Sequence, residues 1–214
     1  MEKKRFEREL PSGYTLARHI NCKKTKFAIL MNVFCIVIMA AITLAMYFAA
    51  VEKFTGESLG LFMGVGCGLA LIPIFIYTAL HELVHGWAYK RMTGEKLTFG
   101  LTWSCAFCGV PGIYVYRAVS IFALMAPFVV FGVIFGGLAL VAIFVAKATG
   151  SVAVLFLYAM LSVLLGAHVG GCVGDLYVFG LLIFKYRGKK TLIRDTGPEQ
   201  FIYVLDDTVL EEQL

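Results

Sequence analysis

Residues 69–87 read LALIPIFIYTALHELVHGW, in which twelve almost purely apolar residues run directly into two histidines and a glutamate. Such an apolar run is typical of a helix in the hydrocarbon core of a membrane, where an ionisable side chain is costly unless it is paired, hydrated or bound to a metal. The whole chain agrees, since its 214 residues are 60% hydrophobic, 14% aromatic and only 15% charged. This composition excludes a soluble domain with a polar surface, and we expect a membrane protein.

The apolar residues are gathered into long stretches. Each is longer than the ~20 residues that a helix needs to cross a hydrocarbon core of ~30 Å. The stretches are 27–50, 59–89, 118–146 and 152–184. They predict an all-α membrane protein with four transmembrane helices. The first stretch has no short apolar region followed by a small-residue cleavage site, so we do not expect a removable signal peptide.

Charge placement predicts the orientation of these helices, because Lys and Arg near span ends stay on the cytoplasmic side. Of the 19 basic residues, 17 lie in 1–26, 90–117 and the tail after 184, and the short connections 51–58 and 147–151 hold one lysine each. Both termini are therefore expected in the cytoplasm. The expected organisation is an N-terminal segment (1–26), a four-helix transmembrane domain (27–187) and a C-terminal tail (188–214).

The net charge of +5 arises from basic residues that flank the spans, while the aromatic residues lie inside them. It is a topology signal and not the footprint of a nucleic-acid-binding protein. A weak attraction to anionic lipid head groups is its further consequence.

The connection 96–117, KLTFGLTWSCAFCGVPGIYVYR, is too apolar for a solvated loop of its length. We expect a strand-like or re-entrant segment on the cytoplasmic side, suited to pairing with an unwound substrate or simply packed on the bundle. Its Cys105 and Cys108 form a lone CxxC. Without a second pair this spacing is weak support for a structural zinc site, and the reducing cytoplasm argues against a standing disulfide.

Only two formally charged residues lie within the four stretches, Glu82 in the second and Asp175 in the fourth. Three of the four histidines, His81, His85 and His168, share the same two stretches. Polar residues inside a membrane also join helices by hydrogen bonds, which is the plainer interpretation. Their grouping nevertheless favours a functional site.

The HExxH pattern of residues 81–85 gives that site a chemistry. On a helix His81 and His85 lie four residues apart and share one face, where both imidazoles can reach one Zn²⁺ at about 2 Å. Glu82 beside them is suited to a catalytic role, taking a proton from water without being a ligand itself.

A catalytic zinc usually has three protein ligands, and Asp175 is the expected third. His81 lies 22 residues and Asp175 lies 23 residues from the outer ends of their helices. At 1.5 Å per residue these depths are roughly 33 and 35 Å, which permits a shared site. Cys172, three residues before Asp175, is an alternative ligand.

His168 lies about two helical turns before Asp175, roughly 10 Å shallower, too far to share the ion easily. We expect it to be catalytic by stabilising an oxyanion or orienting a neighbour, with interhelical hydrogen bonding as the alternative. Gly166, Gly170 and Gly174 recur every fourth residue, a stripe that lets helix backbones approach closely.

These motifs resemble a known family. HELVHGWAYKRMTG, with Gly86 after the second histidine, GGCVGDLY on the last span and LPSGY before the first are similar to the putative zincin peptidases, small bacterial membrane proteins related to site-2 proteases. The resemblance implies a zinc site of His81, His85 and Asp175 with Glu82 catalytic, facing the cytoplasm within the membrane. One departure is that Gly174 precedes Asp175 and Leu176 follows it, whereas site-2 proteases typically have glycine after the aspartate.

The expected function is therefore an integral-membrane zinc metalloprotease that hydrolyses peptide bonds of membrane-associated substrates at or within the bilayer. A non-catalytic, metal-binding scaffold or chaperone for membrane peptides is the alternative. A small transporter is disfavoured because there are four helices and no visible internal repeat. The expected partners are a membrane-associated peptide or protein and the lipid bilayer, and the sequence leaves the oligomeric state open.

Overall fold

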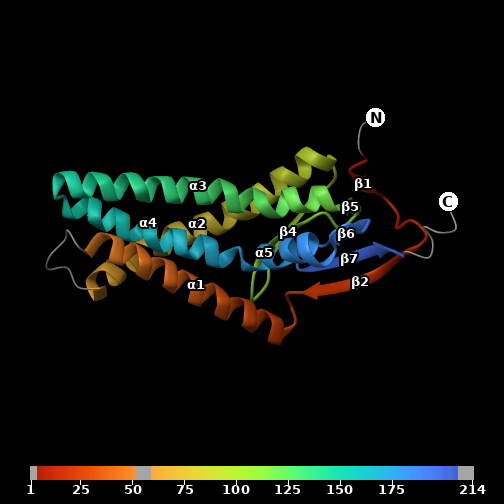
Figure 1. The fold of residues 1–214 in the computed structure, drawn as a ribbon, viewed down its shortest axis with the longest axis horizontal. Helices are drawn as coiled ribbons and strands as arrows, with labels where there is room; N and C mark the ends of the chain where they lie inside the picture. The colour runs from red at the N-terminus through yellow and green to blue at the C-terminus, as the bar shows by residue number, and fades with distance from the viewer. Residues whose placement is uncertain (1–3, 52–58, 207–214) are drawn as a thin grey trace. The chain divides into compact units, whose positions relative to one another are not determined.

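The computed structural model describes residues 4–51 and 59–206. Four helical stretches in this part of the chain are long and apolar enough to cross a membrane. They are α1 (Thr25–Val51), α2 (Leu59–Thr93), α3 (Arg117–Thr149) and a fourth stretch in which α4 (Val152–Gly171), α5 (Val173–Gly180) and the π-helix η1 (Leu181–Lys185) follow one another (Figure 1). The four predicted apolar helices are present. The predicted external connection 51–58 lies, from residue 52 on, outside the described residues.

The structure also contains two antiparallel sheets. The larger has five strands in the order β1-β5-β6-β7-β2. Its strands are β1 (Phe6–Glu7), β2 (Tyr14–Asn21), β5 (Tyr114–Tyr116), β6 (Thr191–Asp195) and β7 (Glu199–Leu205). The smaller sheet pairs β3 (Thr98–Leu101) with β4 (Ala106–Gly109). The connection 96–117 thus contains strands, as its composition predicts.

The predicted all-α class is wrong, because the described residues contain a five-stranded and a two-stranded antiparallel sheet. The larger sheet combines strands of the N-terminal segment, of the connection 96–117 and of the tail. Strand β2 of the N-terminal segment pairs with β7 near the C-terminus, and β1 pairs with β5 (Figure 1). These strands are short and partly polar, so a search for long apolar stretches passes over them. The pairing of β2 with β7 and that of β1 with β5 are non-local and leave no trace in the local pattern.

The chain forms two compact units. Unit 1 comprises Met1–Leu30, His81–Ala126 and Asp175–Leu214, and unit 2 comprises Met31–Leu80 and Pro127–Gly174. Both sheets therefore belong to unit 1. So do His81, Glu82, His85 and Asp175, whereas His168 and Cys172 belong to unit 2.

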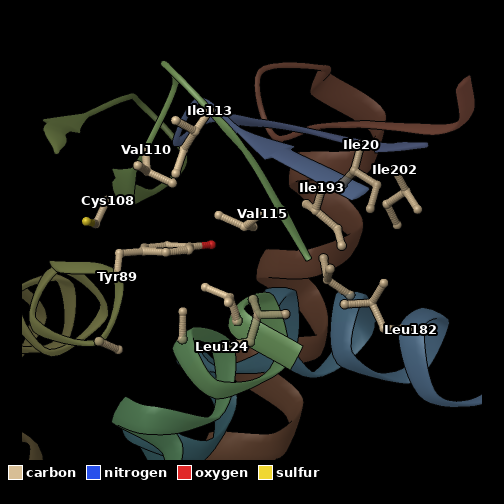
Figure 2. Close-up of a cluster of buried hydrophobic side chains, with 14 of the residues drawn as sticks. Ile20, Tyr89, Cys108, Val110, Ile113, Val115, Leu124, Leu182, Ile193 and Ile202 are labelled. Atoms are coloured by element: carbon tan, nitrogen blue, oxygen red, sulfur yellow. The ribbon is translucent and has the colours of Figure 1, made fainter. Parts of the chain in front are cut away.

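The core of unit 1 lies between its strands and helices (Figure 2). Val115 of β5 and Ile193 of β6 are fully buried on the sheet, and Leu124 of α3 and Leu182 of η1 are buried on the helices. Tyr89 of α2 extends its ring into the same cluster (Figure 2). Because α2 carries the two histidines of HExxH, this core fixes the helix that presents them.

The glycine stripe of α4 packs against α1 within unit 2. A Cβ built at Gly170 would overlap the main-chain carbonyl of Cys35, and one at Gly166 would lie 2.7 Å from the carbonyl oxygen of Met39. Small residues at these positions let the two backbones approach closely. The predicted close helix packing is present, with α1 as the partner of these two glycines.

Substituting Gly170 by alanine is expected to lower the melting temperature of the protein in detergent. The new methyl group meets main-chain atoms, which yield less readily than a side chain, and overpacking of this kind costs roughly 1–3 kcal/mol. Gly136→Ala on α3 is the matched control, because no described atom lies within 4 Å of a Cβ there. Thermal unfolding followed by circular dichroism checks this, and a Gly170→Ala protein that melts at or above the wild-type temperature would contradict it.

Candidate metal centre

His81 and His85 lie one helical turn apart on α2, and each is 7% exposed. Their Nε2 atoms are 3.2 Å apart. The ring of His85 is fixed from the other side, because its Nδ1–H donates to the main-chain carbonyl of Ala123 on α3 at 2.8 Å. With the proton on Nδ1, the Nε2 lone pair of His85 remains directed toward His81, which is the arrangement of a metal-binding imidazole.

Asp175 supplies a carboxylate to the same point. It lies in the first turn of α5, where the helix dipole favours a negative charge. Its Oδ2 is 3.3 Å from Nε2 of His81 and 3.3 Å from Nε2 of His85. The structure thus brings together the three residues that the sequence predicts as ligands, all within unit 1.

The three atoms fit a zinc ion. They form a nearly equilateral triangle with sides of 3.2, 3.3 and 3.3 Å. In a tetrahedral zinc site with bonds of about 2.0–2.1 Å, two ligand atoms lie about 3.3–3.4 Å apart. Two imidazole nitrogens and one carboxylate oxygen are also a donor set that zinc prefers, and three protein ligands leave a fourth position open.

Glu82 follows His81 on α2 and is half-buried. Its carboxylate is near enough to His81, His85 and Asp175 to interact with them electrostatically, and it is not one of the three atoms of the triangle. Because Glu82 lies beside the candidate metal site without being a ligand, its carboxylate can accept a proton from water.

Two further residues that the sequence did not reveal hold α2 in place. Tyr89, one turn beyond His85, donates its hydroxyl hydrogen to Oδ2 of Asp195 on β6 at 2.7 Å. Asp195 is 2% exposed and also accepts from the amide of Gly197 at 2.8 Å and from Gln200 at 3.2 Å. The only available signal was the i, i+4 spacing of Tyr89 from His85, because its partner is 106 residues away.

Burial of Asp195 predicts a specific pH dependence of stability. Burial raises its pKa to about 6, although Tyr89 and Gly197 donate to the carboxylate. The native protein therefore binds this proton more tightly than the unfolded chain, whose aspartate pKa is about 3.9. The resulting stabilisation is complete below pH ~4 and is lost as the pH rises through ~6, by an amount on the order of 2–3 kcal/mol.

Asp195→Asn is expected to remove this part of the pH dependence. Melting temperatures of both proteins in detergent between pH 4 and 7 check it, since the difference between the two curves isolates Asp195 from other titrating groups. A difference in melting temperature between the two proteins that is the same at every pH does not bear on this prediction. Curves that stay parallel across this range would contradict the assignment.

His168 is fully buried in unit 2, and both of its ring nitrogens have partners there. Nε2–H donates to the carbonyl of Phe128 at 3.0 Å, and the hydroxyl of Tyr77 lies 2.9 Å from Nδ1. Since a carbonyl only accepts, Nε2 carries the hydrogen and Nδ1 of the neutral ring accepts from Tyr77. These are interhelical hydrogen bonds, the alternative that the sequence left open. The catalytic role of His168 stays a prediction.

Cys172, the other possible ligand, caps the C-terminus of α4. It is fully buried in unit 2, and its Sγ lies 3.7 Å from Nδ1 of His168. The triangle of His81, His85 and Asp175 is formed without it.

Comparison with known protein families agrees with this chemistry. Residues 74–189, more than half of the chain, match the family described as "Putative zincin peptidase". The chain belongs to this zincin peptidase family. The matched range includes His81, Glu82, His85 and Asp175, and the family implies zinc as the metal and suggests metallopeptidase activity. No curated protein and no solved structure matches the chain.

Proposed function

We propose that the protein is an integral-membrane zinc metallopeptidase, related to site-2 proteases, that hydrolyses peptide bonds of membrane-associated substrates at or within the bilayer. The triangle of His81 Nε2, His85 Nε2 and Asp175 Oδ2 carries this proposal. The two histidines belong to the candidate span Gly60–Thr93, and Asp175 belongs to the candidate span Val152–Lys185. A site built on such helices is accessible to a peptide that is itself in the membrane.

In this proposal His81, His85 and Asp175 hold the zinc, which supplies Lewis acidity toward a carbonyl oxygen and toward water. Glu82 accepts a proton from the attacking water and later gives it to the nitrogen of the leaving group, which therefore departs as a neutral amine and not as an amide anion. The hydrogen bond from His85 to Ala123 keeps the imidazole in the required tautomer. His168 is retained as a further candidate catalytic residue.

The hairpin of β3 and β4 provides a strand edge on which an extended substrate can bind near the site. A Cβ at Gly86, the residue after His85, would lie 2.6 Å from the ring of Phe99 on β3, so the strand packs closely on the metal-binding helix. Every residue of β3 is exposed, and β4 is its sheet neighbour in the described part of the chain. Its other edge can pair with the backbone of an unwound peptide.

Cleavage of single-span membrane peptides by the purified, zinc-loaded protein in detergent or vesicles tests this function. Mass spectrometry should detect fragments cut within or at the edge of the span. A zinc chelator should abolish the fragments, and added zinc should restore them. Fragments that persist in the presence of chelator would contradict a zinc-dependent peptidase.

We also infer a multi-pass cell-membrane protein with both termini in the cytoplasm, from the four apolar helices and from the basic residues at their ends. In this arrangement residues 27–187 form the membrane domain, between the N-terminal segment (1–26) and the C-terminal tail (188–214). Reporters fused before Met1 and after Leu214 are expected to be cytoplasmic, and one inserted in 52–58 external. An external C-terminal reporter would overturn the four-span arrangement.

A further inference from the structure

Pro127 lies inside α3, well beyond the first turn in which a helix tolerates proline. A proline nitrogen carries no hydrogen, so Pro127 cannot donate to the main-chain carbonyl four residues before it, which is that of Ala123. Ala123 is fully buried. A buried carbonyl that loses its usual donor destabilises the helix unless another group donates to it. The position of Pro127 therefore leaves a buried acceptor without its main-chain donor.

The group that donates to this carbonyl is the ring of His85. Its Nδ1–H lies 2.8 Å from the carbonyl oxygen of Ala123, and both residues are buried in unit 1. In a regular helix this oxygen would point along the axis at the amide four residues further on, and a side chain from another helix would have to compete with that amide. The contact lies within unit 1, and Pro127 acts on it through its covalent place in α3.

This hydrogen bond decides which nitrogen of His85 is free. With the proton on Nδ1, the lone pair is on Nε2, the atom that lies 3.2 Å from Nε2 of His81 and 3.3 Å from Oδ2 of Asp175. A metal-binding imidazole usually donates its other N–H to a carboxylate or to a main-chain carbonyl. The interior of a regular helix has no carbonyl without a main-chain donor, and the missing N–H at position 127 provides one.

We propose that Pro127 is a positioning residue of the metal centre, because it frees the carbonyl of Ala123 to hold His85 with Nε2 directed at the metal. This inference rests on the zinc site of the proposed function and not on peptide cleavage. Its consequence is that an N–H restored at position 127 weakens zinc binding. Loss of an outer hydrogen-bond partner costs ~10–100-fold in metal affinity. The same change favours the helix itself, since alanine is the strongest helix former and proline the weakest.

The test compares Pro127→Ala with a protein that carries lactic acid, the α-hydroxy analogue of alanine, at position 127. Both changes remove the ring and leave a methyl side chain, but only alanine supplies an N–H. Zinc affinity of each full-length protein in detergent is measured by competition with a chromogenic chelator. Pro127→Ala should bind zinc at least ~10-fold more weakly than the wild type, and the lactic acid variant should stay within ~3-fold of it.

Pro73→Ala is the matched control for the loss of a proline from a helix, since Pro73 lies inside α2. The carbonyl that Pro73 frees is that of Leu69, 12 residues before His81 on the same helix. That is about 18 Å along the axis, so neither histidine ligand can donate to it. Pro73→Ala should therefore keep wild-type zinc affinity. In nitrogen-15 spectra of the zinc-loaded protein, the Nδ1–H signal of His85 should change in Pro127→Ala and stay unchanged in Pro73→Ala.

Equal zinc affinity in Pro127→Ala and the wild type would overturn the proposal. An equal loss in the lactic acid variant or in Pro73→Ala would also overturn it, because the bend of the helix and not the missing N–H would then support the site. A metal-free Pro127→Ala protein that melts below the wild type would show a purely structural role. Failure of the proposed function is distinct: a wild-type protein that binds zinc without cutting peptides contradicts that function and not the role of Pro127.

Discussion

Replacing Glu82 by glutamine is expected to leave zinc bound and to lower the rate of peptide-bond cleavage by at least ~10²-fold, the usual contribution of a positioned general base. Glutamine keeps nearly the same shape but cannot accept the proton of the attacking water. Glu82 lies outside the triangle of His81, His85 and Asp175, so metal content should not change. Zinc analysis and peptide cleavage, measured on the same preparation, check both parts.

The matched control for this prediction is Glu95→Gln. Glu95 forms an ion pair with Arg8 at 2.6 Å, so the change removes a carboxylate of the same type away from HExxH. Its metal content and activity should stay at the wild-type level. If Glu82→Gln also retains its metal content, its cleavage activity and every cellular activity of the protein, the metal bound by HELVHGW is structural. The non-catalytic scaffold is then favoured.

Alanine at His81, His85 or Asp175 is expected to leave the purified protein nearly free of zinc. Each substitution removes one corner of a triangle whose sides match a single tetrahedral ion. The loss of affinity should exceed the ~10–100-fold that removal of an outer hydrogen-bond partner costs. Elemental analysis after dialysis against a weak chelator measures it.

His19→Ala is the control for the histidine variants, because His19 lies on β2 and bonds Glu199 at 2.7 Å. It should retain wild-type zinc. A specific pattern would show that the third ligand has been misassigned: full zinc in Asp175→Ala, with loss of zinc in Cys172→Ala or His168→Ala.

The sequence predicted the elements whose signal is local. Long apolar stretches gave the four helices to within a few residues at most ends, and the four-residue spacing of His81 and His85 gave their shared face. Asp175 could be predicted as the third ligand for two reasons. Charged residues are rare in apolar stretches, and its depth along its helix matches that of His81. In each case the deciding information lies within one element or in its length.

What the sequence could not predict depends on contacts between distant segments. The five-stranded sheet pairs β2 with β7 and β1 with β5, and no local pattern specifies those partners. The contacts that hold α2 in place could not be predicted for the same reason. Tyr89 donates to Asp195 and His85 donates to the carbonyl of Ala123, and both partners are distant in the sequence. A main-chain carbonyl has no signature in the residue type, so the second of these contacts was beyond any motif.

X-ray absorption spectroscopy at the zinc edge of the zinc-loaded protein tests the central claim most directly, because it reports which atoms hold the metal. The structure predicts nitrogen and oxygen neighbours at about 2.0–2.1 Å, with the multiple scattering of two imidazole rings. Asp175→Ala should remove the signal by removing the metal. A sulfur neighbour at about 2.3 Å would contradict the account, since it would require a cysteine in place of Asp175.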